Sequence, residues 1–123
     1  MTSHKVIDLN YLKEMSEGSN ELMVELISMF LKQVPLFQEQ LKMLHETKEF
    51  ITLGKLAHKI KSSVAMMGMN ELATDMKTLE DIAKREVEIE KYAVLINKFN
   101  TVSTEAVTEL TQVLNNLKSN KLC

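Results

Sequence analysis

The sequence contains very few residues that end helices or form tight turns. Its 123 residues include 3 Gly and 1 Pro, whereas a protein built from β-sheets needs these residues at its turns. The composition, 45% hydrophobic and 26% charged, also excludes a disordered chain. We therefore predict a nearly all-helical protein, and the length fits a single domain over residues 1–123.

Cysteine and long apolar runs are also scarce. The one cysteine, Cys123, is the last residue and has no internal partner for a disulfide, which is consistent with a reducing compartment. No apolar run reaches the roughly 18 residues of a membrane-spanning helix, and residues 1–10 lack the apolar core of a signal peptide. We expect a cytoplasmic protein that does not enter a membrane.

Positive charge is not in excess, and arginine is almost absent. Fifteen basic residues against seventeen acidic ones give a net charge of -2, which argues against a nucleic-acid binder. Only Arg85 can make the bidentate contacts with which arginine recognises phosphate or carboxylate. This weakens the case for a small enzyme that clamps an anionic substrate with several arginines.

Apolar spacing predicts two helices in the first part of the chain. A short helix begins near Asp8, which can cap it, and a turn around Gly18 follows. The second helix continues through Pro35, because the apolar phase is kept on both sides. We expect a kink there, since proline lacks an N–H and its ring crowds the carbonyl one turn back. The apolar positions of this helix are Leu22, Leu26, Met29, Phe30, Phe37, Leu41 and Leu44.

Three further helices are predicted. The third covers residues 49–67, and Gly68 supplies a left-handed cap at its end. Asn70 can cap the fourth helix, whose apolar residues are Leu72, Met76, Leu79 and Ala83. A fifth helix begins near Glu90 and continues through the β-branched, polar run 101–104. The expected fold is an all-α, antiparallel four-helix bundle with a short additional N-terminal helix.

One histidine of the third helix lies on the side opposite the apolar arc. At about 100° per residue, His58 points about 150° away from the centre of that arc and therefore faces water. Its neighbours along the helix are Gly54, Lys61, Ser62 and Ala65. Three of these are small and leave the imidazole accessible, while Lys61 places a positive charge beside it. Gly54 could equally be small because another helix packs closely against it.

Such a histidine suits attack on an external electrophile. Imidazole is nucleophilic near neutral pH and can carry a phosphoryl group on nitrogen, and Lys61 with Lys59 would offset the added negative charge. The alternative is an idle, solvated side chain. Glu80, at a similar height on the next helix, could orient the ring by accepting a hydrogen bond, with Lys84 one turn further. Alternatively, Glu80 and Lys84 form a solvated i,i+4 pair.

The remaining histidines and the methionines give weaker signals. His4 lies near the N-terminus and His45 near a helix end, and neither is expected to do chemistry. Nine methionines are present; Met67 is expected in the core, whereas Met66 and Met69 could form a flexible surface that accepts several partners. The full candidate docking surface is Gly54, Lys55, Ala65, Met66 and Met69.

The segment 57–63, together with Gly68 and Leu72, resembles the signature of histidine-containing phosphotransfer (HPt) domains. That family has an Ala-His pair, an aliphatic residue two positions after the histidine and a lysine at the third. The resemblance implies that His58 is phosphorylated and that Lys61 lies beside the phosphoryl group. It also implies that Glu80 hydrogen-bonds the ring and that Gly68 shapes the turn. Ser62 stands where the family usually has Gly, and its hydroxyl is a further candidate contact for the phosphoryl group.

The resemblance implies a phosphorelay carrier. Its partners would be receiver domains of response regulators and of hybrid histidine kinases, and any Mg²⁺ would come with the receiver. The sequence contains no Gly-rich phosphate loop and no obvious metal-binding constellation of its own. We expect a monomeric carrier without kinase activity. The alternatives are a helical adaptor that binds partners without being phosphorylated and, third, an enzyme that turns over a small molecule.

Overall fold

A computed structural model describes residues 6–122 of the chain, and the regular elements in this part are all helical. The prediction of an all-helical protein is therefore confirmed. Within residues 6–122, no helix combines the length and the apolar character needed to cross a membrane. The elements are α1 (Asn10–Met15), α2 (Asn20–Glu46), α3 (Phe50–Met66), α4 (Asn70–Lys84), the 3₁₀ helix η1 (Ile89–Lys91) and α5 (Tyr92–Leu122).

A side-chain hydrogen bond caps α2, and two long helices continue through residues that could interrupt them. The Ser19 hydroxyl accepts a hydrogen bond from the Leu22 amide at 3.2 Å and caps α2. As predicted, α2 continues through Pro35. The run 101–104 lies within α5, where the Thr104 hydroxyl donates to the Asn100 carbonyl at 2.7 Å. This hydroxyl is thus satisfied inside the helix, as is common for threonine.

The turn between α3 and α4 requires glycine and fixes the segment before α1. Gly68 has φ +78°, and a Cβ there would lie 2.0 Å from the Asp8 carbonyl oxygen. The Asp8 amide donates to the Met67 carbonyl at 3.0 Å. The predicted cap at Asn70 is wrong, because α4 already begins at Asn70 and Met69 occupies the cap position without a side-chain hydrogen bond. Both helix ends at the turn lie one residue earlier than predicted, at Met66 and Asn70.

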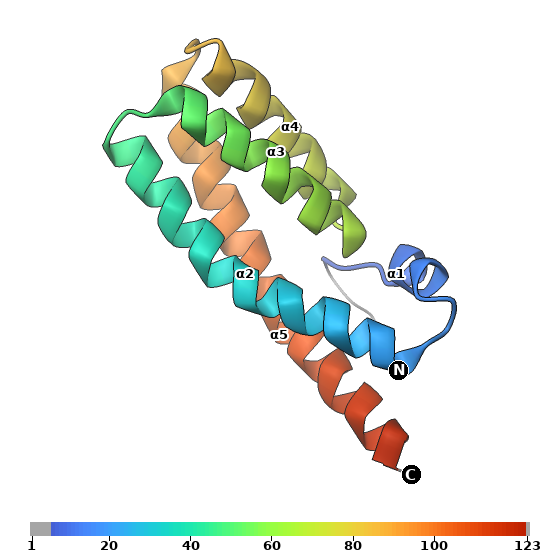
Figure 1. Cartoon of the computed structure of the whole chain (residues 1–123). Helices are drawn as coiled ribbons and strands as arrows, with labels where there is room; N and C mark the ends of the chain where they lie inside the picture. Colours follow the sequence, from blue (N-terminus) through green and yellow to red (C-terminus); the bar gives the residue numbers. More distant parts are fainter. Residues whose placement is uncertain (1–5, 123) are drawn as a thin grey trace.

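The helices pack in a defined set of pairs. The α3–α4 pair has the most extensive contact, followed by α2 with α5; α2 also packs against α3, and α4 against α5. In Figure 1, α2 and α5 run beside each other, and the α3–α4 hairpin lies against one half of their length. The α1 helix lies near the Gly68 end of the hairpin, which is where the Asp8–Met67 hydrogen bond forms. The Gly68 end of the hairpin that carries the candidate site is therefore fixed to the segment before α1.

Buried apolar residues from all five α-helices form one core cluster. On α2 the predicted apolar phase is partly wrong, because Leu22 and Met29 are exposed. The apolar arc of this helix is wider than the face that its neighbours cover, and spacing alone does not tell which part is covered. The buried residues of α2 are Met23, Ile27, Phe30, Val34, Phe37 and Leu41.

Candidate functional site

His58 projects from α3 into solvent while its neighbours fix the helix in the core. Ala57 and Ile60 are fully buried, whereas 58% of the His58 side chain is exposed. Across the hairpin, Glu80 projects from α4 and is only 8% exposed. The Nδ1 atom of His58 lies 2.9 Å from Oε2 of Glu80. The structure therefore brings Glu80 to the ring at hydrogen-bonding distance.

Glu80 interacts with two lysines as well as with the histidine. Lys84 Nζ donates to Glu80 Oε2 at 2.9 Å, and Lys61 Nζ lies 3.8 Å from the other oxygen, Oε1. The hydrogen bond from Lys84, followed by the hydrogen bond and charge of His58, lowers the pKa of Glu80 from 4.5 to about 2, although burial acts in the opposite direction. Glu80 is therefore a carboxylate at neutral pH.

The ionised state of Glu80 decides how the neutral imidazole is protonated. A carboxylate has no proton to donate, so the hydrogen bond at 2.9 Å requires that His58 Nδ1 carries the proton and donates. In the neutral ring the other nitrogen, Nε2, then carries the lone pair. Because most of the His58 side chain is exposed, this arrangement offers a nucleophilic nitrogen to an external partner.

Gly54 is buried between α3 and α4 and does not lie on the exposed surface. A Cβ at this position would lie 2.7 Å from Cγ of Lys84 and 3.0 Å from the backbone oxygen of Glu80. The prediction that Gly54 lies on the face that a partner approaches is therefore wrong, and the alternative of close helix packing is what the structure contains. Gly54 leaves room for the Lys84 side chain, which packs against it and hydrogen-bonds Glu80 on its own helix.

The other predicted site residues are spread over several surroundings. Lys59 Nζ lies 5.9 Å from the centre of the Phe37 ring on α2, so the structure does not bring Lys59 to His58. Ser62 and Lys55 are exposed, and Ala65 and Met66 are half-buried. The predicted exposure of Met69 is wrong, because Met69 precedes α4 and is buried in the core. Met67 is buried, as predicted.

A hollow beside the site involves residues that the sequence analysis missed. Its volume is about 680 Å³, and it lies between α1 and the C-terminal end of α3. Ser62 and Met66 line it from α3, and the exposed Tyr11 and Met15 line it from α1. The only signal in the sequence was that α1 is too short to bury all its apolar residues.

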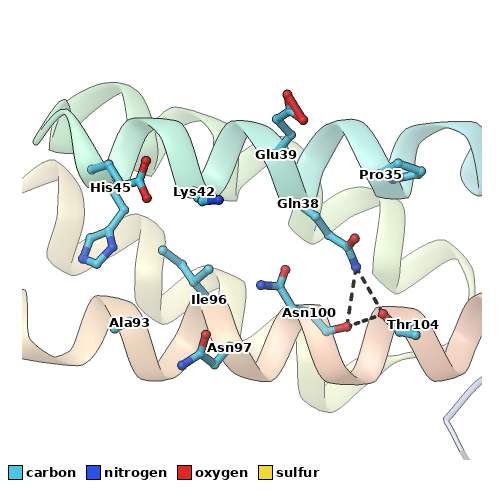
Figure 2. A pocket seen from close by; sticks show the side chains of 11 residues that line it. Pro35, Gln38, Glu39, Lys42, His45, Ala93, Ile96, Asn97, Asn100 and Thr104 are labelled. Carbon is cyan, nitrogen blue, oxygen red and sulfur yellow. Dashed lines mark hydrogen bonds between the residues drawn. The ribbon is translucent and has the colours of Figure 1, made fainter.

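A second hollow lies away from His58, between α2 and α5, and Figure 2 shows the residues that line it. The Gln38 amide spans it by donating to Ser103 Oγ at 3.0 Å and to Thr104 Oγ1 at 3.3 Å. His45 lines the same hollow, and its ring lies 6.4 Å from that of Tyr92. No carboxylate hydrogen-bonds this histidine in the described residues, in contrast to His58. His4 lies outside them.

The geometry can be compared with known protein families. The model of the Hpt domain family matches residues 25–120, and the chain therefore belongs to this family. Hpt domains carry phosphoryl groups in phosphorelays, interact with receiver domains and are not kinases. Comparisons with curated proteins and with solved structures gave no significant match. Over residues 6–122, no group of three or more His, Cys, Asp or Glu side chains is placed to hold a metal ion.

Proposed function

We propose that this protein carries a phosphoryl group on Nε2 of His58, accepting it from the aspartate of one receiver domain and donating it to the aspartate of another. The observation that carries the proposal is the 2.9 Å contact between His58 Nδ1 and the Glu80 carboxylate. This contact fixes the ring and leaves Nε2 free. The four long helices serve as an antiparallel bundle that presents this ring at the surface of a cytoplasmic protein.

The transfer is a direct exchange of one bond for another. The Nε2 lone pair attacks the phosphorus of the receiver's aspartyl phosphate. The N–P bond forms while the P–O bond to the aspartyl carboxylate breaks, and that carboxylate leaves with the electron pair. The ring then has hydrogen on Nδ1 and phosphorus on Nε2, and it carries a positive charge. The reverse sequence, with a second receiver's aspartate as the attacking group, returns the ring to neutrality.

The charges around His58 suit this change. The Glu80 carboxylate at Nδ1 stabilises the positive ring that forms, because opposite charges attract most strongly where water is partly excluded. Lys84 lowers the pKa of Glu80 through its hydrogen bond at 2.9 Å. Lys61 lies only 3.8 Å from the same carboxylate and offsets the negative charge of the phosphoryl group. We assign Mg²⁺ to the receiver, not to this chain.

The surface next to His58 offers a site at which the receiver can dock. Ser62 is exposed one turn beyond the histidine, and the hollow between α3 and α1 adds the exposed Tyr11 and Met15. Methionine side chains adapt to different partners. A carrier that accepts from one receiver and donates to another needs such adaptability, and this surface supports the proposal.

Label transfer from a charged receiver tests the proposal. A panel of receiver domains is phosphorylated with a radiolabelled small-molecule phosphodonor, freed of it, and mixed with wild type, His58→Gln or His45→Gln. Label should move to the wild type and to His45→Gln, and not to His58→Gln. Label that reaches all three proteins equally, or none of them from any receiver, would overturn the proposal. Receiver binding without transfer would favour the adaptor alternative.

A further inference from the structure

A line of exposed apolar residues follows α2 and takes no part in the site described above. Leu22, Met29, Leu36 and Met43 are spaced seven residues apart, and they are 37%, 56%, 61% and 53% exposed. Seven residues turn an α-helix through about 700°, so each falls about 20° short of the one before. The four side chains therefore lie on one slowly winding line along the outside of the helix.

A second set of residues completes the pattern of a coiled coil. Leu26, Gln33 and Gln40 each follow a member of the first line by four residues. Alternating steps of four and three are the spacing of the two inward positions in a heptad repeat. We call these seven residues the α2 seam: Leu22, Leu26, Met29, Gln33, Leu36, Gln40 and Met43. Glutamine at inward positions limits the stability of such a seam.

We propose that the α2 seam binds the α2 seam of a second copy of this chain in antiparallel orientation. The charged residues along one edge of the seam select this partner and this orientation. Lys32 and Glu39 lie three residues after Met29 and Leu36, and both are exposed. When Gln33 of one copy lies opposite Leu36 of the other, Lys32 of each copy faces Glu39 of the other. The symmetry of a dimer forms this ion pair twice.

Other arrangements do not match the charges as well. In a parallel pair, the charged edge would face the opposite edge of the other seam, where Met23, Phe30 and Phe37 are buried in the core of their own copy. In the proposed register the like-charged Glu25 and Glu46 meet only at the ends of the seam, where water and salt screen them. The central Lys32–Glu39 pairs therefore favour the antiparallel arrangement.

The surface beside the seam contains a matching hollow. A hollow of about 130 Å³ lies between α2 and α3, and its lining includes Leu26, Met29 and Met66. In the proposed register Met43 of the second copy lies opposite Leu26. Its flexible side chain can enter the hollow as a knob enters a hole. The hollow and the seam thus point to the same partner residue.

Self-association at the seam leaves the His58 ring accessible, although Met66 lines both the hollow at the seam and the hollow next to His58. Ser63 lines the hollow on α3, and five residues separate it from His58. Five residues correspond to about 140° around a helix, and the hydrogen bond of His58 is made with Glu80 on α4. The inference therefore goes beyond the proposed function and does not depend on it. It replaces the monomer expected from the sequence with a weak dimer.

Sedimentation of the full chain over a range of concentrations tests the dimer. The wild-type mass should rise from 14.1 kDa towards twice that value. Leu36→Glu and Met43→Glu should each weaken the dimer at least tenfold. Val94→Glu is the matched control, because Val94 is 66% exposed on α5, and it should dimerise as the wild type does. Helical circular dichroism shows whether each variant is folded. A wild type that remains monomeric up to about 1 mM, or a control that dissociates as readily as the seam variants, would overturn the proposal.

Cross-linking tests the register. In a Cys123→Ser background, chains with Lys32→Cys are mixed with chains with Glu39→Cys and exposed to a mild oxidant. The mixture should form disulfide-linked dimers several times faster than either chain alone. Equal rates in all three samples would show that the proposed register is wrong. The Leu36→Glu variant should still accept label from a charged receiver, and this result separates dimer formation from phosphoryl transfer.

Discussion

His58 Nδ1 on α3 and Lys84 Nζ on α4 both lie 2.9 Å from the same oxygen atom, Oε2 of Glu80. One carboxylate oxygen therefore accepts two hydrogen bonds, one from the imidazole of His58 and one from Lys84, which lies one helical turn after Glu80. The hydrogen bond from Lys84 lowers the pKa of Glu80, and the ionised carboxylate keeps the ring proton on Nδ1. Glu80 thus links Lys84 to the ring that exposes Nε2.

Substitution of Glu80 should slow phosphoryl transfer. Glu80→Ala removes the group that stabilises the positive ring and should slow transfer from a charged receiver by about tenfold, which corresponds to about 1.4 kcal/mol. Glu80→Gln keeps an acceptor oxygen without its charge and should have a smaller effect. Single-turnover transfer kinetics measure both rates. Asp81→Asn is the matched control, since Asp81 pairs with Arg85 at the surface; identical rates for all four proteins would exclude a role for Glu80.

Glu80 should also make the stability of the protein depend on acid pH. Its pKa is lowered from 4.5 to about 2 in the folded protein, chiefly by the hydrogen bond from Lys84. A carboxyl group whose pKa is lower in the folded than in the unfolded protein stabilises the fold at pH values above its unfolded pKa. This stabilisation is lost as the pH falls through the pKa of the folded protein. The free energy of unfolding should therefore decrease between about pH 4.5 and pH 2, with up to about 3 kcal/mol due to Glu80.

Urea denaturation at a series of pH values measures this dependence. The Glu80→Gln variant should show a flatter curve than the wild type over the same pH interval, because it has no proton to bind. Asp81→Asn should keep the wild-type slope. Parallel curves for wild type and Glu80→Gln would mean that the contacts of Glu80 with His58 and Lys84 do not persist in solution.

The effect of Gly54→Ala on stability tests whether Gly54 is buried between two helices or exposed to solvent. At an exposed helix position, Gly→Ala stabilises a protein by about 1 kcal/mol. Here the added Cβ would lie 3.0 Å from the Glu80 carbonyl oxygen and 2.7 Å from Lys84 Cγ, so the hairpin must open slightly. We expect Gly54→Ala to destabilise the protein by about 1–3 kcal/mol, as measured by chemical denaturation, and to slow transfer by displacing Lys84. Stabilisation by this substitution would mean that the close α3–α4 contact is absent.

Gly68 and Gly18 form a matched pair for a test of the α3–α4 turn. Both have positive φ, +78° and +79°, but only Gly68 faces another part of the chain, at Asp8. Gly18→Ala should cost about 1–2 kcal/mol, from backbone strain alone. Gly68→Ala should cost about 3 kcal/mol or more, because the Cβ also collides with the Asp8 backbone. Thermal or urea unfolding measures both, and equal costs would show that Asp8 does not contact the turn.

The sequence predicted the helices well because their signals are local. The left-handed position of Gly68, the continuation of α2 through Pro35 and the continuous α5 all follow from residues within a few positions of one another. The exposure of His58 also follows from the angle between its side chain and the apolar arc of the same helix. These features need no knowledge of what packs against each helix.

The errors come from contacts between helices. A helical wheel shows in which direction Gly54 points. It does not show that α4 lies in that direction, with the Lys84 side chain packed against Gly54. In the same way, the wide apolar arc of α2 does not show that Met29 stays exposed while Val34 is buried. Lys59 was predicted to act with Lys61 beside the phosphoryl group, yet its ammonium lies over the ring of Phe37 on α2.

The nitrogen that carries the phosphoryl group is the most direct test of the account. The wild type is phosphorylated by a charged receiver, with ¹⁵N-labelled histidine, and the ¹⁵N and ³¹P NMR spectra identify the N–P bond. The account predicts a single phosphohistidine, bonded through Nε2 and absent from His58→Gln. Phosphorus on Nδ1, or a phosphohistidine that persists in His58→Gln, would contradict it.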